Sequence, residues 1–129
     1  MRRSGGGEEG SEVVATVLLQ GLVLVVVLAM LQIGFALHTR NLAISAAQEG
    51  ARRGGLLGGD EAEAVARTRE ILSSFVGADE DPRIEAVRST LGGREVLVVT
   101  VETAVPVVGA LGPRWLTVVG RSLVERGLP

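Results

Sequence analysis

Residues Val13–Thr39 read VVATVLLQGLVLVVVLAMLQIGFALHT, a run without a formal charge that lies between Glu12 and Arg40. As a helix this run would be roughly 40 Å long, which exceeds the bilayer hydrocarbon core of about 30 Å. A β-strand rarely exceeds about 10 residues, so the length favours a helix even though the central part is rich in Val. The sequence therefore predicts a transmembrane helix, with its span at residues 13–37.

A cleaved secretory signal is the main alternative for this run. Its apolar region is typically about 7–15 residues long, and a small-residue cleavage site follows directly. Here the run is longer and is followed by His38-Thr39-Arg40-Asn41, which favours a retained span. Arginine counts on the two flanks differ by one and slightly favour a cytoplasmic C-terminus, so charge alone leaves the orientation open.

Composition excludes several classes of site. The chain has no Cys and a single His, so a disulfide scaffold, a Cys nucleophile and a multi-His metal site are excluded. Its formal net charge of −2 provides no electrostatic footprint for nucleic acid. We expect neither cofactor nor metal, and no nucleic-acid partner.

The helix that contains the span should begin at Ser11 and continue beyond the membrane to Arg53. Residues 42–53 contain no Pro and are rich in Ala, the best helix former, and Gly54-Gly55 is a plausible stop. At 100° per residue, small and polar side chains fall into one stripe along this helix: Gly21, Gln32, Ala43, Ala46 and Gly50. Small residues let helices approach closely, so the stripe predicts helix–helix assembly and an oligomer through the long helix. The alternative is that Ala and Gly are simply frequent in this chain.

The rest of the chain divides by composition. Residues 1–10 are Gly-, Glu- and Arg-rich and are expected to form a disordered polar leader. Residues 54–59 are a Gly-rich linker, and residues 60–129 a small domain. A helix is predicted over residues 60–76, with Asp60 as N-cap and Glu63 completing a capping box. Its apolar face comprises Val65, Thr68, Ile71, Leu72 and Phe75, and Gly77 is the expected stop.

Three strands are predicted after this helix, at residues 83–88, 95–105 and 116–124. Gly92-Gly93 should form the tight reversal between the first two. The expected fold class is therefore α+β: a long N-terminal transmembrane helix that extends out of the membrane, followed by one helix packed on a small three-stranded antiparallel sheet. A core of this size is marginal, so the long helix or a partner subunit should help to cover it.

The sequence offers little chemistry. His38 is explained as a polar residue where the helix leaves the lipid, and Asp79-Glu80-Asp81 as a solvated turn rather than a calcium site. Trp115 could be an exposed binding anchor, but a cap on the edge of the small core is the preferred interpretation. Since no set of polar residues suggests catalysis, we expect a protein that is not an enzyme. A membrane-tethered enzyme would need a converging polar pocket in the domain.

Taken together, several motifs resemble a known family. Gly10-Ser11 precede the apolar helix, Arg40-Asn41 follow it, and Ala46-Ala47-Gln48-Glu49-Gly50-Ala51-Arg52 comes next. This arrangement resembles the TadE-like family of pseudopilins encoded with tight-adherence (Flp) pilus systems, in its actinobacterial form. The resemblance is strongest from Gly10 to Arg52 and weaker in the segment Pro106–Gly109.

The resemblance implies a pilin-like minor pseudopilin in the cytoplasmic membrane, with the N-terminus inside and the C-terminal domain outside. A membrane prepilin peptidase would remove the leader after Gly10 and leave Ser11 as the new N-terminus. Implied partners are other pilin-like proteins and the Tad secretion platform, whose assembly work the protein would support. Pilin-like sequences usually carry Glu at the fifth position after cleavage, where this chain has Ala15.

Two readings therefore remain beside a processed pseudopilin. One is a membrane-resident assembly factor that does not enter the filament. The other, from a different class, is a single-pass anchored binding module of the cell envelope without a pilus role.

Overall fold

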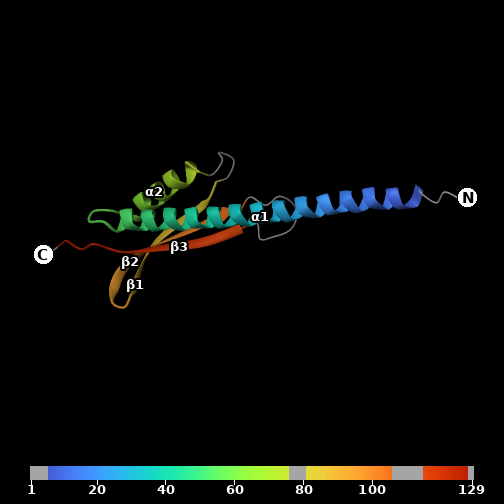
Figure 1. The fold of residues 1–129 in the computed structure, drawn as a ribbon. Coiled ribbons are helices and arrows are strands. Elements are labelled where there is room, and N and C mark those ends of the chain that lie inside the picture. Colours follow the sequence, from blue (N-terminus) through green and yellow to red (C-terminus); the bar gives the residue numbers. More distant parts are fainter. Residues whose placement is uncertain (1–5, 76–80, 106–114, 128–129) are drawn as a thin grey trace, which may run out of the picture. The chain divides into compact units, whose positions relative to one another are not determined.

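The computed structural model describes residues 6–75, 81–105 and 115–127. Its elements follow the order α1 (Gly6–Gly55), α2 (Glu61–Ser73), β1 (Arg83–Leu91), β2 (Arg94–Ala104) and β3 (Trp115–Leu123) (Figure 1). The predicted α+β fold class is thus confirmed. The chain forms two compact units, Met1–Gly34 and Phe35–Pro129. The second unit, called the domain below, contains the C-terminal part of α1 and all other elements.

Helix α1 is longer than predicted at both ends. It begins at Gly6 rather than Ser11, so residues 6–10 are helical where we expected disorder, and it ends at Gly55 rather than Arg53. Glu8 and Glu9 lie in its first turn and Arg52 and Arg53 in its last. These charges complement the helix dipole at both ends, which offsets the poor helix propensity of the terminal glycines.

Helix α2 begins where its capping signal predicts. The Asp60 side chain accepts a hydrogen bond of 2.7 Å from the backbone N–H of Glu63. The helix ends at Ser73 rather than residue 76, and the expected stop Gly77 lies outside the described residues. Thr68 and Leu72 are buried as predicted, together with Ala64, which we had not assigned to this face. Phe75 follows the end of the helix and is exposed, so its predicted place in the apolar face is wrong.

The sheet is an antiparallel meander in the order β1-β2-β3. The first two strands pair from Arg83↔Glu102 to Leu91↔Arg94, which leaves Gly92 and Gly93 as a two-residue turn. Both glycines have positive φ, 58° and 77°. A type I′ turn requires this conformation at both central residues and matches the twist of the strands, so the predicted reversal is confirmed.

One face of the sheet carries the core. Leu97, Val99, Val101 and Thr103 alternate along β2 and are all buried. Leu97, Val99 and Val101 form one cluster with Leu72 of α2 and with the alanines of α1, including Ala43 and Ala47. Both helices therefore cover the same face, and the long helix supplies the cover that a domain of this size lacks by itself. The opposite face, called the outer face below, carries Val87, Val119 and Leu123, all exposed.

Trp115 lies at the start of β3 and is 72% exposed. The preferred interpretation of this residue as a cap on the core is therefore wrong. The register pairs Trp115 with Ala104 on the outer face, away from the cluster that the helices cover. Strand alternation, rather than hydrophobicity, decides where its side chain points.

Candidate functional site

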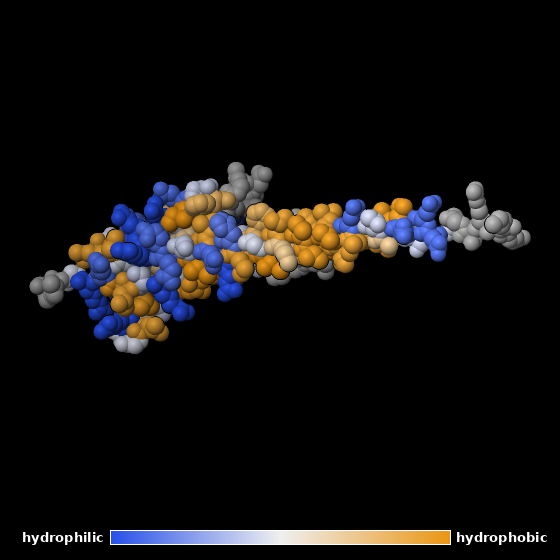
Figure 2. Space-filling model, viewed as in Figure 1, coloured by the Kyte–Doolittle hydropathy of each residue, from blue (hydrophilic) through white to orange (hydrophobic). Residues whose placement is uncertain are grey.

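The first functional surface is the apolar part of α1. It is the one helix among the described residues that is long and apolar enough to cross a membrane. Its large apolar side chains are exposed throughout, with fractions such as 63% at Val13, 68% at Leu18 and 56% at Leu37. Figure 2 shows this apolar surface over the middle of the helix.

The energetics of this surface call for an apolar environment. Burying one Val or Leu side chain is worth roughly 1.5–3 kcal/mol, so a helix of such residues left in water would cost tens of kcal/mol. The free energy of unfolding of a whole domain is only about 5–15 kcal/mol. Since the helix satisfies its own backbone hydrogen bonds, lipid can supply the required cover.

The second feature is a set of small residues in the part of α1 that belongs to the domain. Ala43, Ala46, Ala47 and Ala51 are completely buried, and Gly50 is buried with them. A Cβ added at Gly50 would overlap the side chain of Thr68, and one added at Gly120 would overlap the backbone of Ala47. The small residues thus allow α2 and β3 to pack closely against the backbone of α1, with no larger side chain between them.

The predicted stripe therefore divides along the helix. Ala43, Ala46 and Gly50 pack within their own domain. Gly21 is exposed, and nothing lies within 4 Å of a Cβ added there. Gln32 is half-buried. Two further buried alanines of α1, Ala47 and Ala51, were missed, although their i, i+4 spacing from Ala43 could have indicated them.

The predicted processing residues lie in the second turn of α1. Gly10 and Ser11 are both exposed, and nothing lies within 4 Å of a Cβ added at Gly10. The nearby Glu12 uses its backbone carbonyl to accept a hydrogen bond of 2.9 Å from the Thr16 hydroxyl.

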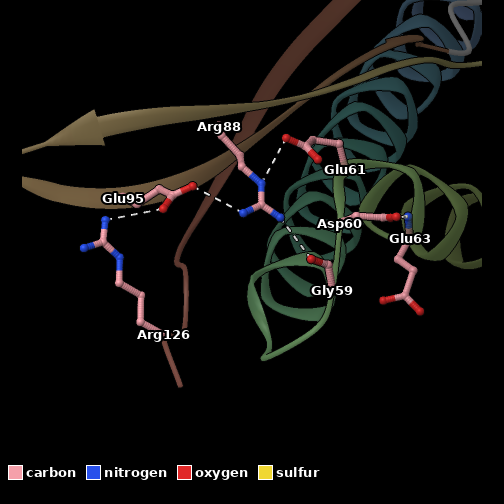
Figure 3. A network of polar contacts seen from close by, with 7 residues as sticks. All are labelled: Gly59, Asp60, Glu61, Glu63, Arg88, Glu95 and Arg126. Carbon is pink, nitrogen blue, oxygen red and sulfur yellow. Dashed lines mark hydrogen bonds and ion pairs between the residues drawn. The ribbon is translucent and has the colours of Figure 1, made fainter. Parts of the chain in front are cut away.

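A polar network joins α2 to the hairpin (Figure 3). Arg88 donates to the Glu61 carboxylate at 3.0 Å, to the Glu95 carboxylate at 3.2 Å and to the Gly59 carbonyl at 3.0 Å. Arg126 reaches the other oxygen of Glu95 at 3.5 Å. The hydrogen bond to Glu95 and the charge of Glu61 raise the pKa of Arg88. Arg88 of β1 thus joins the start of α2 to the hairpin through three acceptors, and the contacts are those of a structural network rather than of a reactive centre.

A groove of about 850 Å³ lies between the C-terminal end of α1 and β3. Its charged lining mixes both signs, with Glu49 and Arg52 from the helix and Arg121 and Glu125 from the strand side. Such a lining selects neither an anion nor a cation. Over residues 6–75, 81–105 and 115–127, no group of three or more His, Asp or Glu side chains is placed to hold a metal ion.

His38 and Asp81, which were considered as chemical candidates, belong to no larger polar cluster among the described residues. His38 is exposed on α1. Asp81 pairs with Arg69 of α2 at the surface, while Asp79 and Glu80 lie outside the described residues. Within the part of the chain that the structure describes, the geometry thus gives apolar and packing surfaces rather than a set of converging catalytic groups.

Comparison with known proteins agrees with the resemblance seen in the sequence. Residues 10–52 match the family model described as TadE-like protein. The matched segment lies within α1 and contains the apolar surface, Gly10, Ser11 and the buried alanines. No curated protein and no solved structure matches the chain. The TadE-like resemblance is confirmed over this segment.

Proposed function

We propose that this TadE-like chain is a bitopic, non-catalytic minor pseudopilin, or membrane-anchored factor, that supports assembly of a Flp-type pilus. It would cross the cytoplasmic membrane once, with its N-terminus on the cytoplasmic side and its domain outside the cytoplasm. The observation that carries the proposal is the exposed apolar surface of α1 within the segment that matches the TadE-like model. The proposed partners are other pilin-like proteins and the Tad secretion platform.

The packing of the domain supports a mechanical role. Residues 43–51 of α1 form part of the core, so the domain is built directly on the helix that would anchor it. The inner face of the sheet is thereby occupied by the chain's own helices. Surfaces left for partners are the outer face, the groove beside β3 and the apolar surface with Gly21.

Processing between Gly10 and Ser11 is the part of the proposal with a chemical readout. The chain is co-expressed with a prepilin peptidase, extracted from the membranes and analysed by intact mass spectrometry. We expect loss of residues 1–10, and we expect Gly10→Leu to abolish it. Gly7→Leu, at another open helical glycine, is the matched control. A wild-type chain that keeps Met1 would reject processing and leave a membrane-resident assembly factor.

Topology can be tested separately because the chain has no Cys. Leu57→Cys, at a side chain that is 67% exposed between α1 and α2, should react with a membrane-impermeant maleimide added to intact cells. In cells without a prepilin peptidase, where residues 1–10 are retained, Gly7→Cys should react only after the membrane is opened. The reverse pattern would overturn the proposed orientation.

The alternative function is a single-pass binding module of the cell envelope. It is favoured by the absence of a match over residues 53–129, which include most of the domain. Deletion of the chain from a host with a Flp pilus distinguishes the two. Unchanged piliation would support the binding module, and loss of pili that the chain restores would support the pilus role.

A further inference from the structure

The exposed Trp115 is not covered by the core that the helices form with the sheet. It is the single Trp of the chain, which has no Tyr and two Phe. An indole carries a large apolar surface and one N–H donor, so it is most stable where one side is apolar and the other is wet. Its 72% exposure on the outer face leaves this large surface uncovered by the domain.

Two contacts fix the height of Trp115 along α1. Gly120 of β3 lies against the backbone of Ala47, and Leu123 lies against Gly55 with its carbonyl oxygen 2.7 Å from a Cβ added there. The three strand steps from Gly120 to Leu123 cover about 10 Å, and the eight helix steps from Ala47 to Gly55 beside them cover about 12 Å. Strand β3 and this part of α1 therefore run nearly parallel and in the same direction (Figure 1).

Extending this correspondence places Trp115 beside the end of the apolar run. Trp115 precedes Gly120 by five residues, about 16 Å along the strand, which equals roughly eleven residues of helix. Trp115 is thus level with a position near residue 36 of α1. Phe35 lies at this level and is 59% exposed, and the polar residues His38, Thr39 and Arg40 follow just beyond Leu37.

The surroundings of Trp115 change from apolar to charged within one step of the sheet. Its partner across the strands is Ala104, while the next row on the outer face contains Thr117, Glu102 and Arg83. This row lies about 7 Å further along the strand, away from the level of Phe35. An aromatic side chain at the apolar boundary with charges just beyond it is the arrangement found where membrane proteins meet the headgroup layer.

We propose that Trp115 inserts into the interfacial layer of the bilayer that α1 crosses, and that it holds the end of the sheet on the membrane surface. The inference rests on the proposed membrane topology and adds a second, independent lipid contact to it. The occupant is lipid because the position coincides with the end of the apolar run. A protein partner at this height would itself have to lie in the headgroup layer.

The single Trp makes the test direct. The full chain is reconstituted in phosphatidylcholine–phosphatidylglycerol vesicles, and its fluorescence is quenched by lipids brominated at a shallow acyl position or by aqueous acrylamide. We expect strong quenching by the brominated lipid and weak quenching by acrylamide. Two reporters on a Trp115→Phe background serve as references: Phe35→Trp at the end of the apolar run and Leu57→Trp, whose parent side chain is exposed far along the domain.

The references separate failure of this inference from failure of the anchor. We expect lipid quenching of Trp115 to approach that of the Phe35→Trp reporter and to exceed that of the Leu57→Trp reporter several-fold. If the Phe35→Trp reporter is quenched by lipid and Trp115 behaves like the Leu57→Trp reporter, the inference is wrong while the anchor stands. Absence of lipid quenching at both Trp115 and the Phe35→Trp reporter overturns the anchor as well. Protection of Trp115 from both quenchers would indicate a protein contact and also reject the inference.

Discussion

Gly120 of β3 lies so close to Ala47 of α1 that a side chain at position 120 would overlap the helix backbone. Gly120 cannot carry a side chain without separating the strand from the helix, because the obstruction is main chain rather than a movable side chain. This contact makes the C-terminal part of α1 an integral layer of the domain.

The first prediction tests this contact. Gly120→Ala should lower the stability of the domain by at least about 1–3 kcal/mol, the usual cost of overpacking. The measurement is thermal unfolding of the full chain in detergent, followed by circular dichroism of the strand signal. Gly34→Ala is the control, since nothing lies within 4 Å of a Cβ added there. Equal melting temperatures for the two variants would contradict the packing.

The second prediction separates packing inside the chain from assembly between chains. Ala46→Leu should destabilise the domain by about 1–3 kcal/mol, because position 46 is completely buried. Gly21→Leu should leave the melting temperature unchanged and reduce cross-linking between copies in membranes, if the exposed part of the stripe mediates assembly.

Two results would contradict this division. Reduced stability in Gly21→Leu would mean that position 21 packs within the chain. Cross-linking of Gly21→Leu at the wild-type level would remove the stripe as an assembly surface.

Much of the fold was predictable because its signals are local. The charge-free run from Val13 indicates a membrane helix by its length, Asp60 indicates a helix start, and Gly92-Gly93 indicate a hairpin turn. Each depends on residues close together in the sequence, so the structure needs no other part of the chain to form them.

The partners of each surface were less predictable. Small residues at helical spacing have the same pattern whether the helix packs on its own domain, as at Ala46, or on another chain, as proposed at Gly21. Trp115 presents the same difficulty, because alternation shows that two faces exist but not which one the helices cover. Phe75 fits the helical period, yet α2 ends at Ser73, and boundaries shift by one or two residues for small energetic reasons.

The third prediction concerns the polar network. Arg88→Gln removes donors to Glu61, Glu95 and the Gly59 carbonyl, so the melting temperature should fall by a few degrees, and the loss should shrink at high salt. Arg83→Gln is the matched control, since Arg83 forms a surface ion pair with Glu85 of its own strand rather than a contact with α2.

The raised pKa of Arg88 sets the pH dependence of this contribution. A cation whose pKa is raised on folding adds stability that is fully present below its unfolded pKa and is lost only as pH rises through the folded value. Since both values lie in strong alkali, the difference between wild type and Arg88→Gln should not change between neutral and mildly alkaline pH. A difference that vanished in that range would show that Arg88 is not the responsible group.

The fourth prediction concerns the hairpin. Gly93→Val should destabilise the sheet by about 1–2 kcal/mol, because a β-branched residue is strained at the positive φ of 77° found there. Gly92→Asn should be nearly neutral, since Asn-Gly is the preferred pair for this turn. Both are measured by thermal unfolding, and a harmless Gly93→Val would mean that the turn changes its type.

The last prediction is a stabilising change in the core. Thr103 is 1% exposed, and its hydroxyl oxygen has no hydrogen-bond partner among the described residues. An unsatisfied buried hydroxyl costs about 1–3 kcal/mol, and Val replaces it with a methyl group of nearly equal size. Thr103→Val should therefore raise the stability by about 1 kcal/mol, whereas Thr100→Val, on the half-buried outer face of the same strand, should change it by less than about 0.5 kcal/mol. A loss of stability in Thr103→Val would show that the hydroxyl does have a partner, and the end of the sheet beside Trp115 would then be more polar than its burial indicates.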